Sequence, residues 1–135
     1  MRYVLMTAMV LALAAPAWAE YRLEFEGTCF REYYCGVTLK LTNESDAPLT
    51  EINGYVASRI GDEQVGRSRG ASFINLAPGE SATALFEAPH APCDEATQYE
   101  FIVGACRFGP SFSPKEECAA LIRGVAPVAE VAGTL

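Results

Sequence analysis

The sequence has very little histidine and methionine. Its one histidine is His90, and its three methionines all lie within the first nine of 135 residues. Copper sites of small β-domains need histidine together with methionine or cysteine, and hydrolytic centres need a histidine beside a nucleophile. His90 lies in a loop with a proline on either side, where a solvated side chain is the simpler interpretation. The sequence therefore predicts no catalytic residue, no metal site, no cofactor and no enzymatic activity.

The one apolar run near the N-terminus is too short to be a membrane anchor. It covers residues 3–15, whereas a transmembrane helix needs about 20 residues. Pro16 ends the run, and Ala17-Trp18-Ala19 presents the small-x-small pattern that signal peptidases cut. We expect residues 1–19 to be a cleaved secretion signal, Glu20 to be the first mature residue, and no integral membrane span to remain. The expected location is the periplasm or the medium.

Basic residues are outnumbered by acidic ones. The chain has 10 Lys and Arg against 17 Asp and Glu, a net charge of −7. Such a surface argues against nucleic acid and anionic membranes as partners. Removal of 19 of the 135 residues leaves 116, the size of one domain. Residues 20–126 are expected to form that domain, and residues 127–135 a flexible C-terminal tail.

Five cysteines follow the signal, and in an oxidising compartment they are first of all disulfide partners. They are Cys29, Cys35, Cys93, Cys106 and Cys118. Counting strands up and down places the loops with Cys29, Cys35 and Cys93 at one end of the domain. The loop between Cys106 and Cys118 lies at the other end. We therefore expect a Cys106–Cys118 bridge and a bridge from Cys93 to Cys29 or Cys35; a local Cys29–Cys35 bridge is the alternative.

Period-two alternation predicts an all-β domain. Tyr21, Leu23 and Phe25 alternate with charged residues, and residues 37–42 alternate in the same way, which is typical of antiparallel strands with one solvated face. Further strands are expected at residues 51–60, 65–69, 71–76, 81–87, 97–108 and 118–125. Seven or eight short strands separated by turns indicate an antiparallel β-sandwich, with a closed barrel as the competing architecture.

Three short motifs carry a resemblance. Leu41-Thr42-Asn43 ends a strand before a polar turn, Leu76-Ala77-Pro78-Gly79-Glu80 opens a later strand, and Phe86 is that strand's aromatic residue. Over residues 37–87 the chain resembles the immunoglobulin-like modules common in bacterial envelope proteins. The resemblance implies an immunoglobulin-like sandwich, although the buried tryptophan of antibody domains is missing, and the cysteines are expected to staple this sandwich with disulfides. It implies little about activity, because such folds host many functions.

The loop from Cys29 to Cys35 is unusually aromatic. It contains Phe30, Tyr33 and Tyr34, and aromatic residues are enriched at binding hot spots. We therefore expect a non-enzymatic binding or accessory domain whose partner is another envelope protein; the alternative for these rings is that they cover the core. The alternative function is a thiol–disulfide redox module, because the Cys29–Cys35 spacing resembles the redox pair in the immunoglobulin-like domain of bacterial transmembrane thiol reductases.

Three other features are interpreted structurally. Residues 65–69 carry two arginines, and charge of this kind is typical of an edge strand. Tyr55 is a candidate surface aromatic that could belong to an interface. Asn43-Glu44-Ser45 matches a glycosylation sequon, but its side chains also suit a turn, and the turn is the interpretation that we favour.

Overall fold

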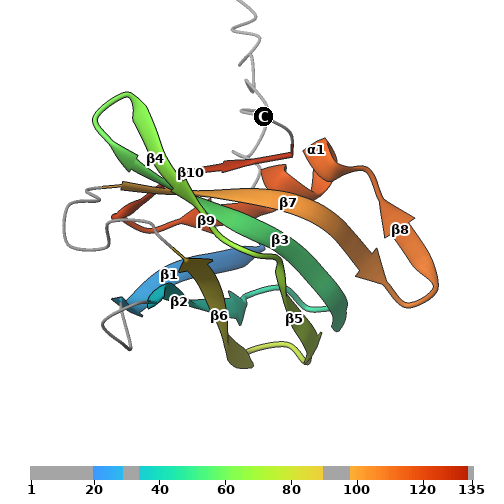
Figure 1. Ribbon diagram of the computed structural model, residues 1–135. Helices are drawn as coiled ribbons and strands as arrows, with labels where there is room; N and C mark the ends of the chain where they lie inside the picture. Colours follow the sequence, from blue (N-terminus) through green and yellow to red (C-terminus); the bar gives the residue numbers. More distant parts are fainter. Residues whose placement is uncertain (1–19, 29–33, 90–97, 134–135) are drawn as a thin grey trace, which may run out of the picture.

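The computed structural model describes residues 20–28, 34–89 and 98–133, which form ten strands and one short helix (Figure 1). The elements are β1 (Tyr21–Thr28), β2 (Tyr34–Asn43), β3 (Leu49–Ile60), β4 (Glu63–Arg67), β5 (Ala71–Leu76), β6 (Ser81–Pro89), β7 (Gln98–Phe108), β8 (Ser111–Ser113), α1 (Lys115–Ala120), β9 (Ile122–Gly124) and β10 (Val128–Ala132). The predicted signal and its cleavage site before Glu20 therefore lie outside the described residues or at their border.

The strands form two sheets, which confirms the predicted all-β, two-sheet class. One sheet has the order β6-β2-β1-β9, and the other has the order β10-β7-β3-β4, with β5 also paired to β3 and β8 to β7. The chain changes sheet between β2 and β3, between β5 and β6, between β6 and β7, and again before and after β9. Most pairings are antiparallel, as predicted. The pairs β1–β9 and β10–β7 are parallel, whereas the predicted sandwich was purely antiparallel.

The alternation seen in the sequence sets the inner face of the first sheet. Leu23 of β1 faces Leu41 of β2 in the antiparallel register, and both side chains are fully buried. Arg22 and Glu24 point the other way and form an ion pair at 2.8 Å on the outer side. One face of the strands therefore supplies the core, and the other faces solvent.

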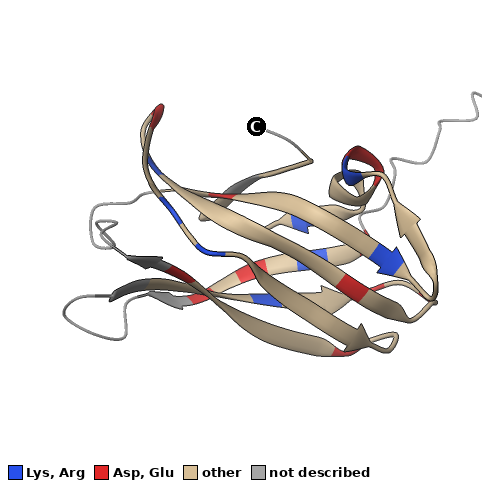
Figure 2. Cartoon of the chain, turned by 45° about the vertical axis from the view of Figure 1, so that its right-hand side comes forward, with Lys and Arg blue, Asp and Glu red and all other residues tan. Residues whose placement is uncertain are grey.

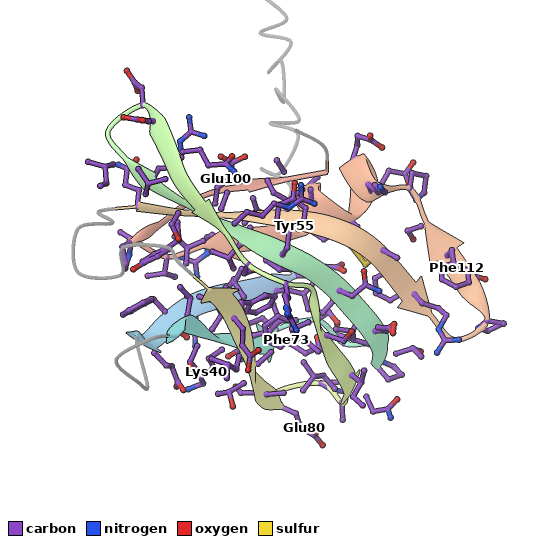
Figure 3. The ribbon with its side chains drawn as sticks, viewed as in Figure 1. Lys40, Tyr55, Phe73, Glu80, Glu100 and Phe112 are labelled. Atoms are coloured by element: carbon purple, nitrogen blue, oxygen red, sulfur yellow. A yellow bond between two sulfur atoms is a disulfide. The ribbon has the colours of Figure 1, made fainter. Side chains whose placement is uncertain are left out.

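Three phenylalanines join the two sheets. Phe86 of β6 contacts Phe101 of β7 and Phe73 of β5, with ring centroids 5.7 Å and 5.9 Å apart, and Phe73 lies 6.4 Å from Phe101. All three are buried, and each contributes about 1.5–3 kcal/mol through burial. Figure 3 shows Phe73 in the middle of the molecule.

Asn43 organises the polar turn after β2. Its side chain is fully buried, and its amide nitrogen donates to the carbonyl oxygens of Ala47 at 2.9 Å and Leu76 at 3.0 Å. Its amide oxygen accepts from the backbone N–H and the hydroxyl of Ser45 at 2.9 Å and 2.6 Å. Leu76 ends β5 in the other sheet, so Asn43 links the two sheets. Both hydrogens of the nitrogen that would carry a glycan are already used, in keeping with the turn interpretation.

Tyr21 begins β1 next to this turn. The side chain is 1% exposed, and its ring stacks on Phe108 with centroids 6.3 Å apart. Burial raises the pKa of the Tyr21 hydroxyl above its ordinary value; a hydrogen bond with Ser45 opposes part of this rise, and the nearby charge of Glu20 adds to it. The neutral phenol is therefore the form that the folded chain favours.

The C-terminal part differs from expectation. The predicted strand at residues 118–125 is instead α1 followed by β9, because Pro114 and the acidic Glu116 and Glu117 form the start of a short helix. The predicted flexible tail, residues 127–135, contains β10, which pairs with β7. Val128 is 2% exposed, so burial of an apolar side chain holds this segment against the sheet.

The bridge expected between Cys106 and Cys118 is present. Both cysteines are fully buried, their Cα atoms are 5.9 Å apart, and the bond ties α1 to β7. Cys29 and Cys93 lie outside the described residues, as does the side chain of Cys35. Their pairing stays a prediction.

Candidate binding site on the six-stranded sheet

The binding residues expected from the sequence lie largely outside the described part of the chain. Phe30 and Tyr33 are in the segment that the structure does not describe, and Tyr34 is the first residue of β2, without a described side chain. The binding role of this loop stays a prediction. The described residues offer a different candidate on the outer face of the sheet that contains β3 and β7.

The candidate site begins where one edge of β3 passes from one partner strand to another. β5 pairs with Leu49–Gly54, and β4 pairs with Ala57–Ile60; Figure 1 shows both strands alongside β3. Ser68 fills the gap between them. Its backbone N–H donates to the carbonyl of Val56 at 2.8 Å, and its hydroxyl accepts from the N–H of Val56 at 2.8 Å. The connection from β4 to β5 is therefore held firmly against β3.

A β-bulge lies at the same level on the other edge of β3. Asn53 faces Ala105 and Gly54 faces Val103, so Gly104 is an extra residue on β7. Bulges bend a sheet locally and redirect side chains. A Cβ atom at Gly104 would lie 2.5 Å from the amide oxygen of Asn53. Glycine at this position therefore leaves room for the Asn53 side chain on the outer face.

The strand exchange and the bulge together leave an open groove of about 630 Å³. We call it the arginine groove. Its lining includes Arg67 of β4, Arg69 of the following connection, Asn53 and Tyr55 of β3, Ser72 of β5 and Gly104 of β7. The volume is in the range of pockets that bind small ligands or single side chains of a partner.

Arg67 is held in place by Tyr55. Its guanidinium carbon lies 4.0 Å from the centroid of the Tyr55 ring, which is the geometry of a cation–π contact. Arg67 is opposite Ala57 in the β3–β4 register, two residues along from Tyr55 and on the same face. Stacking uses the flat face of the guanidinium and leaves its edge, which carries the N–H donors, available to a ligand.

The two arginines of the groove are not neutralised by the described carboxylates. The ion pairs of the described residues involve Arg22, Lys40 and Arg59 as the basic partners, and neither Arg67 nor Arg69 is among them. No aspartate or glutamate of the described residues lines the groove. Figure 2 shows basic positions along the segment that leads from β4 toward β5. The groove is thus a basic region on an acidic protein.

A row of side chains crosses the same face beyond the groove. Ile74 of β5 is opposite Glu51 of β3, Glu51 is opposite Arg107 of β7, and Arg107 is opposite Phe112 of β8. Ile74 is 57% exposed and Phe112 is 70% exposed; Figure 3 shows Phe112 standing at one edge of the molecule. The Arg107 guanidinium lies 5.8 Å from the Phe112 ring. Apolar side chains therefore flank a polar centre.

The sequence indicated parts of this site without assembling it. Tyr55 was a candidate interface residue, and the arginine-bearing segment was expected at a sheet edge, where β4 indeed lies. What it missed is that Arg67 stacks on Tyr55. The available signal was the turn at Gly61-Asp62, which folds β4 back along β3 and returns the arginine to the level of the tyrosine.

Among residues 20–28, 34–89 and 98–133, no three His, Cys, Asp or Glu side chains lie close enough together to hold a metal ion. Within those same ranges, no helix is both long enough and apolar enough to cross a membrane.

Comparison with known proteins gives a likeness of fold. No family model matches the chain, and no curated protein matches its sequence. A solved structure from the structural characterization of IrmA from Escherichia coli is similar, with a TM-score of 0.60 at 10% sequence identity. The likeness covers 78% of this chain and 91% of that chain. At this identity the chain shares with that protein a β-rich fold.

Proposed function

We propose that this chain is an exported, non-enzymatic binding domain whose partner is another envelope protein. Its proposed location is the periplasm or the medium. Export is supported by the signal-like pattern of residues 1–19 and by the buried Cys106–Cys118 bridge, because disulfides persist in oxidising compartments. The immunoglobulin-like resemblance of residues 37–87 agrees with a module of this kind.

The outer face of the six-stranded sheet is the proposed binding surface. The observation that carries this proposal is the combination of the arginine groove with the exposed row that ends in Ile74 and Phe112. Aromatic and arginine side chains are the residues most enriched at protein interfaces. Leu85, the third large apolar residue that is exposed in the described chain, lies on the other sheet and provides a matched control.

The test is capture of a partner from an envelope extract by the immobilised, exported protein. We expect a specific protein to be retained by the wild type and by Leu85→Ser, and to be lost with the double variant Ile74→Ser/Phe112→Ser. All three side chains are exposed, so the melting temperatures should agree within a few degrees. Equal capture by both variants would place the binding surface elsewhere.

The aromatic loop between Cys29 and Cys35 is proposed as a second contact. Its support is composition alone, namely Phe30, Tyr33 and Tyr34 in a short connection. Replacing Tyr33 and Tyr34 by serine should weaken capture and leave the melting temperature unchanged. A fall of many degrees would show instead that these rings cover the core, because burial of each ring is worth about 1.5–3 kcal/mol.

A further inference from the structure

We propose that the arginine groove binds the carboxylates of an acidic, extended segment of the partner protein. The proposal rests on the proposed function, and it adds the chemistry that the partner must bring. It assigns Arg67 and Arg69 as the residues that recognise the carboxylate, and Tyr55 as the residue that positions Arg67.

The groove is ordered before a ligand arrives. Arg67 is stacked on Tyr55. The backbone of Arg69 is fixed on both sides, because its N–H donates to the carbonyl of Glu87 in β6 at 2.6 Å and its carbonyl accepts from the Ser68 hydroxyl at 2.8 Å. A guanidinium whose position is already restricted loses less conformational entropy on binding, and its edge can hold a carboxylate with two parallel hydrogen bonds.

Charge selects the kind of ligand. The chain as a whole carries a net charge of −7, so an acidic ligand is repelled by the overall charge and attracted to a groove that holds two arginines. Neither arginine of the groove has an ion pair with a described carboxylate, and the described lining is free of acidic residues. An acidic segment therefore meets two arginines in one groove that no described carboxylate neutralises.

The neighbouring side chains favour a peptide over a lipid head group. Ser72 lines the groove and Ile74, two residues further along β5, is exposed on the same face. Side chains two apart on a strand lie about 6.8 Å apart, which matches the spacing of alternate side chains in an extended peptide. An acidic residue over the arginines thus places the side chain two positions along the peptide over Ile74, where an apolar residue fits. An anionic membrane would instead meet the full negative charge of the protein.

The test is a fluorescence anisotropy titration of the exported protein with labelled heptapeptides. One peptide, Ser-Glu-Ser-Val-Ser-Glu-Ser, carries glutamate and valine two residues apart and so on the same face, and in its control glutamine replaces each glutamate. We expect the glutamate peptide to bind and the glutamine peptide to bind at least about tenfold more weakly, since each charge-assisted hydrogen bond lost is worth about a factor of ten. Arg67→Gln should reduce binding by a similar factor, and Arg67→Lys should restore only part of it because lysine lacks the fork.

Arg123→Gln on β9, an exposed arginine of the other sheet, is the matched control and should bind like the wild type. Equal binding of the two peptides, or an equal loss with Arg67→Gln and Arg123→Gln, would overturn the proposal, as would binding to phosphatidylglycerol vesicles in place of the peptide. Loss of partner capture by Ile74→Ser/Phe112→Ser with no effect of Arg67→Gln on either assay would refute this inference and leave the proposed function standing. Tighter binding of the glutamate peptide with no protein captured from the extract would refute the proposed function and leave the specificity of the groove for carboxylates standing.

Discussion

Replacing Asn43 by aspartate should destabilise the protein far more than so small a change in one side chain suggests. The two side chains have the same shape, but aspartate exchanges the donating nitrogen for a second acceptor oxygen. That oxygen would face the carbonyl oxygens of Ala47 and Leu76, now 2.9 Å and 3.0 Å from the nitrogen. The Ser45 hydroxyl lies 2.9 Å from the Ala47 carbonyl oxygen and can turn its one hydrogen from residue 43 toward it, whereas Leu76 loses the side-chain donor that joins the two sheets.

The magnitude follows from burial. A buried polar group left without its partner costs about 1–3 kcal/mol, and more when a charge is involved. We expect Asn43→Asp to lower the free energy of unfolding by about 3 kcal/mol near pH 7. For a domain of this size that corresponds to a fall in melting temperature of about 12 °C. Thermal unfolding followed by circular dichroism measures both values, with Asn75→Asp at an exposed position as the matched control.

The pH dependence identifies the cause. Burial raises the pKa of an introduced carboxyl above about 3.9, its value in the unfolded chain, so the folded variant binds its proton more readily than the unfolded variant. Its stability relative to the wild type should therefore recover as the pH falls through the folded-state pKa. Asn43→Ala should show a similar loss with no such recovery. A loss below about 0.5 kcal/mol for Asn43→Asp, or one independent of pH, would refute the role assigned to this amide.

Three further outcomes are expected. Cys118→Ala should lower the free energy of unfolding by about 3 kcal/mol, the chain-entropy value for a loop of this length. In the wild type, the buried disulfide should resist reduction by dithiothreitol until the protein is unfolded, as thiol trapping would show. Gly54→Ala should cost about 2 kcal/mol or more, because its Cβ would overlap the carbonyl oxygen of Ile102, whereas Gly70→Ala has an ordinary contact of 3.5 Å and should change the urea midpoint little; equal midpoints would contradict this. Tyr21→Phe should reduce the loss of stability above about pH 10, because a raised tyrosine pKa stabilises the fold only below the unfolded value of about 10; parallel pH curves for the two proteins would argue against it.

The sequence predicts a strand most clearly where one face of the strand is buried and the other is exposed to solvent. β1 and β2 alternate because Leu23 and Leu41 face the core while Arg22 faces solvent, and period two makes this visible in any short window. The disulfide between Cys106 and Cys118 followed from the same strand count. These features depend on neighbours in the sequence or on a simple up-and-down path.

The C-terminal elements could not be read in this way. Residues 118–125 look like a strand because they are mostly apolar, yet the helix signal at Pro114 and Glu116 is only one turn long. Val128 has no polar pattern around it, and its place depends on Tyr99 of β7 as a register partner. A partner so distant in the chain leaves no local periodicity to detect.

The candidate site was harder still to predict from the sequence. Arg67 and Tyr55 are each unremarkable in the sequence, and charge on β4 has a sufficient explanation as protection of an edge. Their contact needs the β3–β4 hairpin and its register shift after Ser58. The floor of the groove needs a bulge at Gly104, which sequence periodicity does not encode.

The parallel strands β9 and β10 have a consequence for the order of assembly. Tyr21, at the start of β1, pairs with Ile122 of β9, a partner synthesised about a hundred residues later, and closing so long a loop delays folding. β7 likewise waits for β10. A chain growing from its N-terminus therefore lacks a strand in both sheets until its end is made. If the protein is exported as proposed, the chain stays unfolded while it passes through a translocation channel. It completes its two sheets only after release.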